Sequence, residues 1–147
     1  MKHVFRVCRA VYARLDGEGA SRIGGRWNSP GRPVVYMAES VALAVLENLV
    51  HMKRQDFPSG YVVVGATIPD SIQILSVADI AVEGFERPQQ LGDIWLDTRK
   101  SAVLRVPSVI VASEFNYLLN PRHQDFSRIV AEVPLPFTFD ARLFGPS

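Results

Sequence analysis

Hydrophobic residues in this chain come in short runs that are separated by Gly, Pro and polar residues. Two runs are rich in β-branched residues, which predicts strands at 34–37 and at 61–68. Alternation of apolar and other residues predicts a strand at 4–7 as well. Weaker apolar runs predict further short strands at 72–75, 109–112, 129–133 and 137–139.

One segment, 41–50, has the apolar spacing of an amphipathic helix, VALAVLENLV, and contains no Gly or Pro. Ser40 precedes it and is a favourable N-cap, because its hydroxyl can accept a hydrogen bond from a free backbone N–H. A second helix is predicted at 93–104, with Trp95 on its packed side. The remaining segments are predicted as loops or irregular structure, at 14–25, 56–60, 78–90 and 116–125.

Strands outnumber helices in this pattern and do not alternate with them regularly, which favours an α+β fold over a doubly wound sheet. The length of 147 residues is typical of one domain with a substantial core. We therefore expect a single compact domain over 1–147, with a mixed or antiparallel β core and flanking helices.

Composition narrows the function classes. The net charge is +1 and there is no arginine-rich run, so we expect no direct nucleic-acid binding. The single cysteine, Cys8, excludes a disulfide framework and a cysteine-based zinc site. There is no signal-peptide pattern and no apolar run long enough to span a membrane, so we expect a cytoplasmic protein without membrane association.

Glu47 is the only charged residue between Val41 and Val50. One interpretation places Glu47 on a solvated stripe with Asn48 and His51. The other places its carboxylate beside a buried face, where it needs a cationic or hydroxyl partner, because desolvating an unpaired carboxylate is costly. Arg26, which follows two glycines, is a candidate for the same site or for a purely structural salt bridge with Glu47.

Four further residues are candidates for chemistry: Tyr36, Ser108, Asn116 and His123. Each also has a structural interpretation, such as a buried strand tyrosine or a serine that caps the backbone after Pro107. A Ser–His–acid hydrolase is possible on residue types, but Ser108 lacks the GxSxG turn that exposes a nucleophile. The three histidines are scattered without metal-ligand spacing, so no metal site is predicted.

Several motifs together resemble the RES domain family. They are GGRWNSPG, the tyrosine of VVYMAES, the glutamate of AVLENLVH, then LRVPSVIV and NYLLNP, and the resemblance covers nearly the whole chain. The family is named for a characteristic Arg, Glu and Ser. The chain departs from the pattern at VASEFN, where a proline is expected after the valine, and this affects a connecting segment.

This resemblance implies a toxin of the RES–Xre class of type II toxin–antitoxin systems, with a fold like that of ADP-ribosyltransferases. It implies NAD as the substrate, cleaved by phosphorolysis or hydrolysis, with inorganic phosphate as a candidate co-substrate and no further cofactor. Some family members instead transfer ADP-ribose to a protein. The implied partner is an Xre-type helix-turn-helix antitoxin that covers the active site, and a homodimer within that complex is a further arrangement to consider.

Carried over by motif, Arg26, Tyr36, Glu47 and Ser108 form the catalytic site. Arg26, Tyr36 and Ser108 are expected to bind the substrate as well, with Asn116 as an additional substrate-binding candidate. Breaking the nicotinamide–ribose bond passes through an oxocarbenium-like state, which a carboxylate can stabilise. A planar guanidinium suits bidentate binding of phosphate. Two classes of function follow: an NAD-consuming enzyme, or a catalytically silent nucleotide-binding module, and the intact set of candidate residues favours the enzyme.

Overall fold

The computed structural model describes residues 1–52 and 58–145, and within them it confirms the predicted α+β fold. One mixed sheet runs in the order β4-β5-β6-β2-β1-β3-β7, and β8 pairs with β3 beside β7. All its pairs are antiparallel except β4 with β5. The strands are β1 (Lys2–Arg9), β2 (Val35–Ala38), β3 (Tyr61–Ile68), β4 (Ile74–Ser76), β5 (Val103–Pro107), β6 (Phe115–Leu119), β7 (Val130–Ala131) and β8 (Leu135–Phe137).

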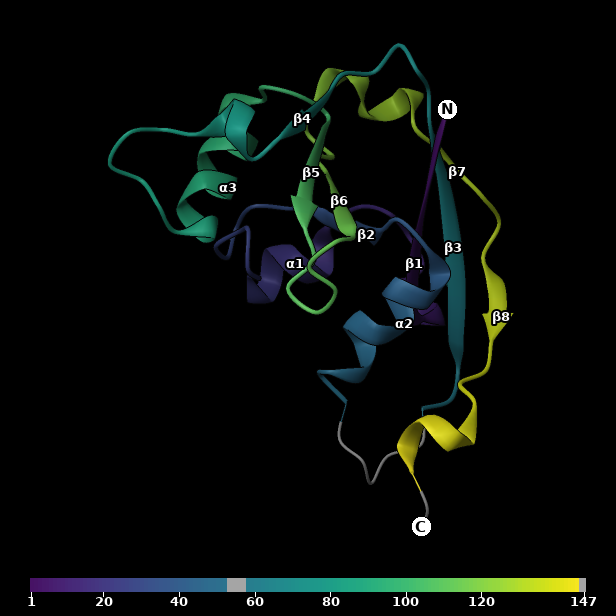
Figure 1. Ribbon diagram of the computed structural model, residues 1–147. Helices are drawn as coiled ribbons and strands as arrows, with labels where there is room; N and C mark the ends of the chain where they lie inside the picture. Colours follow the sequence, from purple (N-terminus) through teal and green to yellow (C-terminus); the bar gives the residue numbers. More distant parts are fainter. Residues whose placement is uncertain (53–57, 146–147) are drawn as a thin grey trace.

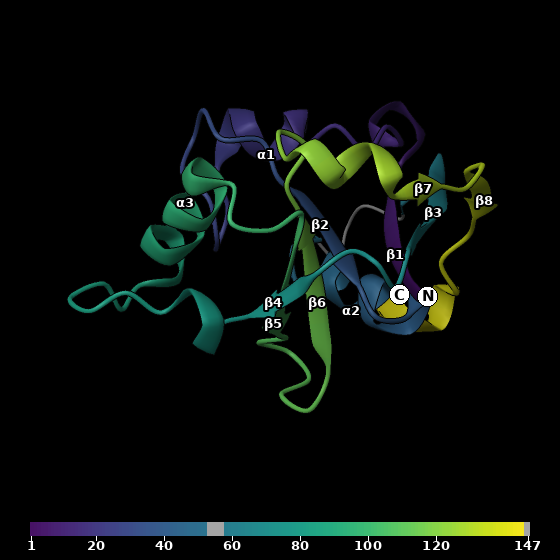
Figure 2. The same cartoon turned by 90° about the horizontal axis from the view of Figure 1, so that it is seen from above.

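The sheet is joined at its middle by a single residue pair. Phe5 of β1 pairs with Ala38 of β2, whereas β1 pairs with β3 over its full length of eight residues. Strands β4, β5, β6 and β2 therefore form one half of the sheet, and β1, β3, β7 and β8 form the other half (Figure 1). Figure 2 shows the two halves side by side along the sheet.

Two apolar clusters lie on one face of this sheet. The Trp95 cluster contains Trp95 and Leu118 and packs helix α3 (Pro88–Thr98) on the β4–β6 half. The Leu43 cluster packs helix α2 (Val41–Leu49) on Ala38 and the β1–β3 half. A third cluster, around Val35 and Leu119, forms the core on the opposite face.

The helix predicted at 41–50 is confirmed as α2, and the Ser40 hydroxyl accepts a hydrogen bond from the Leu43 N–H at 3.1 Å. A short helix, α1 (Glu18–Ile23), lies in the segment predicted to be a loop. Among the described residues no helix is long and apolar enough to cross a membrane.

The helix predicted at 93–104 is wrong at both ends. Helix α3 begins earlier at Pro88, whose fixed φ suits the first helical position, and ends at Thr98 before Arg99. Arg99 has a left-handed backbone with φ of 51°, which stops the helix. The run Val103–Pro107 is strand β5, which lies between β4 and β6. Its apolar residues therefore pack as part of the sheet and not as part of the predicted helix.

Several smaller expectations also differ. No strand forms at 109–112, where the chain turns back, so Ser108 follows a strand and does not open one. The mixed segment at 116–125 contains the well-buried strand β6, because its apolar residues enter the sheet between β5 and β2. The strands predicted at 4–7, 34–37, 72–75 and 129–133 are present with shifted ends, and 61–68 matches. The strand predicted at 137–139 is displaced, because β8 shares only Phe137 with it. The turn predicted at 56–60 lies partly outside the described residues.

Candidate functional site

The carboxylate of Glu47 is held through one of its two oxygens. Oε1 accepts a hydrogen bond from the Ser108 hydroxyl at 3.0 Å and a second from Asn116 Nδ2 at 2.9 Å. Within the described part of the chain, Oε2 has no hydrogen-bond partner. Two fixed donors on one oxygen set the orientation of the whole carboxylate, so Oε2 is the atom that remains available to a ligand.

Ser108 is buried and its hydrogen bonds fix the direction of its hydroxyl proton. Its Oγ accepts from the backbone N–H groups of Ile110 and Val111, both at 3.1 Å. A hydroxyl has one proton and two lone pairs, and both lone pairs are therefore occupied. The proton is left to donate to Glu47, so Ser108 positions the carboxylate and has no free lone pair with which to act as a nucleophile.

Asn116 lies in a row of paired residues that crosses the sheet. On β6 it pairs with Val106 of β5 on one side and Ala38 of β2 on the other. Val106 belongs to the Trp95 cluster and Ala38 to the Leu43 cluster, so Asn116 lies between them. Its Oδ1 is the one buried side-chain polar atom without a hydrogen-bond partner among the described residues. The site thus combines a positioned carboxylate with a buried acceptor.

Arg26 and Trp27 occupy the corner of a tight turn in which the Gly25 N–H donates to the Asn28 carbonyl at 2.8 Å. Trp27 is buried in the Trp95 cluster, whereas Arg26 is exposed. The buried indole therefore anchors the turn, while the guanidinium of Arg26 is accessible to a ligand.

Tyr36 holds this turn through its hydroxyl. Oη accepts a hydrogen bond from the Trp27 N–H at 3.0 Å and donates one to Asn28 Oδ1 at 2.6 Å. A side chain at Gly25 would place its Cβ 2.8 Å from the same hydroxyl, so the close approach requires glycine. Burial raises the pKa of Tyr36 to about 12. Tyr36 is thus a positioning residue for the Arg26 turn.

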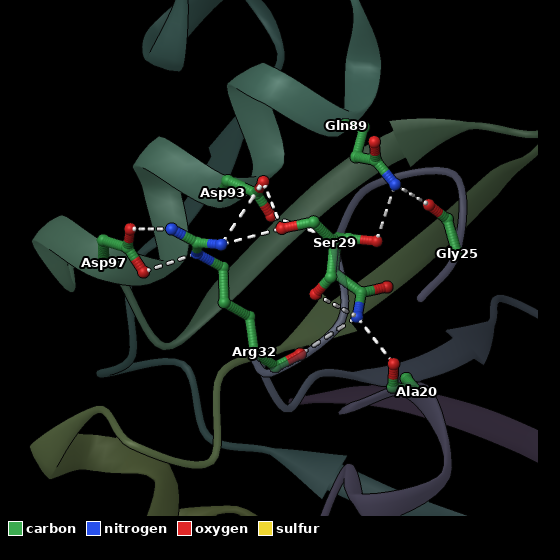
Figure 3. Close-up of polar contacts among 8 residues, drawn as sticks. Ala20, Gly25, Ser29, Arg32, Gln89, Asp93 and Asp97 are labelled. Atoms are coloured by element: carbon green, nitrogen blue, oxygen red, sulfur yellow. Dashed lines mark hydrogen bonds and ion pairs between the residues drawn. The ribbon is translucent and has the colours of Figure 1, made fainter. Parts of the chain in front are cut away.

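Asn28 ties the turn to its surroundings and is fully buried. Its Nδ2 donates to the carbonyl groups of Ala20 in α1 and of Arg32, both at 2.9 Å. Gln89 of α3 donates to the Asn28 carbonyl at 3.1 Å and to the Gly25 carbonyl at 3.3 Å (Figure 3). Side chains and backbone from two helices therefore fix the turn.

The residues after the turn are bound to α3 by acidic side chains. Asp93 accepts from both the backbone N–H of Ser29 at 2.8 Å and its hydroxyl at 2.7 Å. Arg32 makes a bidentate pair with Asp97, with both N–O distances at 2.9 Å, and also donates to the Ser29 hydroxyl (Figure 3). The guanidinium lowers the pKa of Asp97 below its ordinary value. We call these four residues the Asp93 network.

Sequence reasoning missed Gln89, Asp93 and Asp97 as residues that hold the Arg26 turn. They follow one another at intervals of four, which places them on one face of α3. Gly92 on the same helix faces the Trp27 carbonyl so closely that an added Cβ would lie 1.8 Å from its oxygen. This polar spacing could have indicated the supporting face of the helix. The helix was predicted to begin at Asp93, however, which left Gln89 outside it.

The structure brings together Glu47, Ser108 and Asn116 directly, and it places Tyr36 on the same face of the sheet. Tyr36 pairs with Leu118, two residues from Asn116, and such diagonal neighbours lie about 7–8 Å apart. The hydroxyl of Tyr36 binds the Arg26 turn through its hydrogen bonds to Trp27 and Asn28. The turn and the carboxylate site therefore lie on one face of adjacent strands.

Two structural interpretations of Glu47 do not hold. Arg26 forms no ion pair within residues 1–52 and 58–145, and Glu47 is held by Ser108 and Asn116 instead. Asn48 is not on a solvated stripe, because its amide donates to the carbonyl groups of Val7 and Ala44, both at 2.8 Å. Glu47 therefore belongs to a built polar site.

The Ser–His–acid hydrolase is also contradicted by the geometry. His123 accepts a hydrogen bond from the Asp125 N–H at 3.0 Å and so caps a short 3-10 helix. Ser108 has its own partners and no hydrogen bond to a histidine in the described ranges. In those ranges no group of three or more His, Cys, Asp or Glu residues is arranged to hold a metal ion.

This polar site, between two apolar clusters of a split mixed sheet, coincides with the region matched by one family model. The model of the RES domain matches residues 3–140, nearly the whole chain. The chain therefore belongs to the RES domain family.

Curated relatives make the class more specific. The chain is 40% identical over 142 residues to Toxin Res of Yersinia enterocolitica, an alignment that covers 92% of this chain and 93% of the relative. It is 38% identical over 140 residues to Toxin Res of Pseudomonas putida, covering 92% and 96%. A third relative, the Prs ADP-ribosylating toxin of a Sphingobium strain, is 36% identical over 140 residues and is covered to 86%, with 88% of this chain. The protein is a toxin of the RES class.

A solved structure agrees with the fold. The Mycobacterium tuberculosis MbcT-MbcA toxin-antitoxin complex contains a chain that matches with a TM-score of 0.69, over 97% of this chain and 86% of that one. Sequence identity is 18%, so the match supports the architecture alone.

Proposed function

We propose that this RES toxin consumes NAD by cleaving the bond between nicotinamide and ribose. The observation that carries the proposal is the Glu47 carboxylate, oriented by two donors on Oε1 while Oε2 remains open. An oxocarbenium-like transition state develops positive charge at the ribose carbon. A fixed carboxylate beside that carbon stabilises the charge without having to reorganise during the reaction.

The other residues have supporting roles in this proposal. The exposed guanidinium of Arg26 binds a phosphate, either in the diphosphate of NAD or as the attacking anion. Tyr36 fixes the turn that carries Arg26, and Ser108 and Asn116 fix Glu47. The buried Oδ1 of Asn116 suits a donor from the substrate, because an unsatisfied buried acceptor costs about 1–3 kcal/mol.

The acceptor of the ADP-ribosyl group determines the product. Attack by inorganic phosphate gives ADP-ribose-1″-phosphate and nicotinamide, and attack by water gives ADP-ribose and nicotinamide. We propose one of these two depleting reactions as the activity. A second candidate is transfer to a protein side chain, which is supported by the similarity to the Prs ADP-ribosylating toxin.

Incubation of the purified protein with NAD, with and without phosphate, distinguishes these reactions by mass spectrometry of the products. We expect nicotinamide release in every reaction that contains active protein. The Glu47→Gln variant should remain folded and lose turnover by roughly 10²-fold or more, as expected for loss of one electrostatic stabiliser. A folded Glu47→Gln protein with normal turnover would exclude Glu47 from the chemistry, and nicotinamide release only with an added protein acceptor would favour the transferase.

We also propose that an Xre-type antitoxin restrains the toxin by covering this site. Exposed apolar residues lie close to Glu47 and Ser108 along the chain, in α2, at its C-cap and in the loop after Ser108: Leu46, Val50, Val109 and Ile110. A partner resting on them would bury apolar surface next to the carboxylate. The similarity in fold to a chain solved in a toxin–antitoxin complex supports an antitoxin partner for this proposal.

A further inference from the structure

A second polar site lies beside Arg32 and Asp97, the two members of the Asp93 network that also line a cavity. A cavity of about 220 Å³ opens where α3 ends, and its lining includes Arg32, Asp97, Arg99, Asn120 and Arg122. Glu47, Ser108 and Asn116 are not part of its lining. The cavity therefore differs from the site proposed for NAD.

The charge of the cavity is positive. Three arginines and one aspartate line it, which leaves a net charge of +2. Arg32 is neutralised by its bidentate pair with Asp97. Neither Arg99 nor Arg122 forms an ion pair with a residue in the described ranges. Arg99 and Arg122 thus line one cavity from separate segments. The one carboxylate in the lining, that of Asp97, is already paired with Arg32, and its pKa is lowered first by Arg32 and also by the charge of Arg122.

The backbone of Arg99 provides an independent observation. It is the one non-glycine residue with positive φ among the described residues, at 51°. Helices commonly end with glycine or asparagine at such a left-handed position, because other side chains are strained there. An arginine is uncommon at this position, and here its side chain belongs to a residue that lines the cavity.

The floor of the cavity is held in place by hydrogen bonds of Asn120. Asn120 is buried, with Nδ2 donating to the Leu96 carbonyl at 3.1 Å and Oδ1 accepting from the Arg122 N–H at 3.1 Å. These bonds fix the backbone that presents Arg122. The cavity is smaller than the roughly 300–1,000 Å³ typical of sites for drug-sized ligands, which favours a small anion over a whole dinucleotide.

We propose that Arg99 and Arg122 form a binding site for a phosphate group, separate from the catalytic site. Guanidinium groups suit this ligand because they donate in a planar, bidentate geometry to phosphate oxygens. The same chemistry is offered by inorganic phosphate and by the phosphate end of a nucleoside monophosphate. This site goes beyond the proposed NAD reaction and does not depend on it.

Calorimetric titration in the Arg26→Ala background tests the site, because that change removes the phosphate-binding guanidinium proposed for the catalytic site. Inorganic phosphate and adenosine monophosphate are titrated separately at matched ionic strength. We expect saturable binding of at least one of them, weakened about tenfold or more by Arg122→Gln and by Arg99→Gly, as for loss of a charge-assisted hydrogen bond. Tighter binding of one ligand identifies the source of the phosphate group.

Arg99→Gly separates a loss of binding from a loss of stability. Glycine adopts the left-handed backbone without strain, so the melting temperature of this variant should be unchanged or higher. Weaker binding then cannot result from unfolding. The matched control is Arg14→Gln, since Arg14 is an exposed arginine outside the cavity. Absence of saturable binding, or equal affinity in Arg99→Gly, Arg122→Gln and Arg14→Gln, would overturn the site without bearing on the NAD activity.

Discussion

Glu47 illustrates, at the scale of single residues, how two neighbours can prepare a carboxylate for catalysis. Ser108 and Asn116 donate to the same oxygen, and Ser108 is itself held by two backbone N–H groups. The orientation of Glu47 therefore rests on a chain of fixed hydrogen bonds. Residues that act through Glu47 should affect the rate less than Glu47 itself.

Ser108→Ala tests this order of importance. We expect turnover to fall by roughly tenfold, since one donor to Glu47 is lost, and to stay above that of Glu47→Gln. Stability should fall by about 1 kcal/mol, because the N–H groups of Ile110 and Val111 lose their acceptor. Steady-state kinetics and denaturant titration measure both effects. Ser113→Ala, in the exposed part of the same loop, is the control, and turnover as low as in Glu47→Gln would place Ser108 directly in the chemistry.

Tyr36 provides a pH-dependent test. Its pKa is raised from 10.0 to about 12 in the folded protein, chiefly by burial. Its contribution to stability is therefore complete below about pH 10 and is lost as the pH rises toward about 12. Two pKa units correspond to about 3 kcal/mol.

Tyr36→Phe should remove this alkaline loss of stability while lowering stability at neutral pH, because the Trp27 N–H and Asn28 Oδ1 lose their partner. Urea unfolding at pH 7 to 11 measures both effects. Tyr61→Phe, at a partly exposed tyrosine outside the site, is the comparison. An identical alkaline slope in wild type and Tyr36→Phe would show that Tyr36 is not the titrating group.

At the scale of elements, α3 is a support for the Arg26 turn. Its Gln89, Asp93 and Asp97 side chains bind the segment from Gly25 to Arg32. Gly92 allows the helix to touch the Trp27 backbone. The helix contributes no residue to the Glu47 site, and yet it determines where Arg26 can lie.

Gly92→Ala should therefore destabilise the protein by more than about 3 kcal/mol or prevent folding, because the new Cβ would overlap the Trp27 carbonyl oxygen, 1.8 Å away. Intrinsic propensity alone gives the opposite sign, a gain of about 1 kcal/mol for Gly to Ala inside a helix. Thermal unfolding decides between them. Gly19→Ala in α1 is the control: its Cβ meets nothing within 4 Å, so it should be neutral or stabilising.

At the scale of the whole molecule, the sheet divides beside the site. Only the Phe5–Ala38 pair joins β1 to β2, and Asn48 of α2 donates to the carbonyl of Val7 where the strands separate. Helix α2 thus contacts strands of both halves (Figure 2). Its Glu47 is bound by Ser108 and Asn116. An accessible carboxylate at this position is open to a substrate and to an inhibitory partner alike.

We predict that the proposed antitoxin competes with NAD. Arg26→Ala should weaken the complex as well as catalysis, because it removes an exposed guanidinium that can pair with an acidic group of the partner. Val109→Asp should weaken the complex with little change in NAD turnover, since its exposed side chain lies beside the site without joining it. Titration of the partner with and without saturating NAD analogue measures the competition. Unchanged NAD affinity in the saturated complex would exclude occlusion of the site.

Local signals in the chain were enough to predict part of this fold and site. Ser40 with the apolar spacing after it defined α2, and eight apolar or small residues in a row defined β3. Short motifs around Arg26, Tyr36, Glu47 and Ser108 were sufficient for the family. These features depend on neighbours in the chain, so their physical causes are visible in the chain.

The roles of those residues depend on contacts between segments that are distant in the chain. Ser108 and Asn116 lie 61 and 69 positions from Glu47, and no local pattern specifies which carboxylate oxygen they share. The bonds from Ser29 to Asp93 cross 64 positions, and helix α3 was misplaced because its Arg99 terminus and the strand after it are fixed by packing. Hydrogen bonds and burial between distant segments exist only after the chain has folded, and they distinguish the positioning roles of Tyr36, Ser108 and Asn116 from the direct role proposed for Glu47.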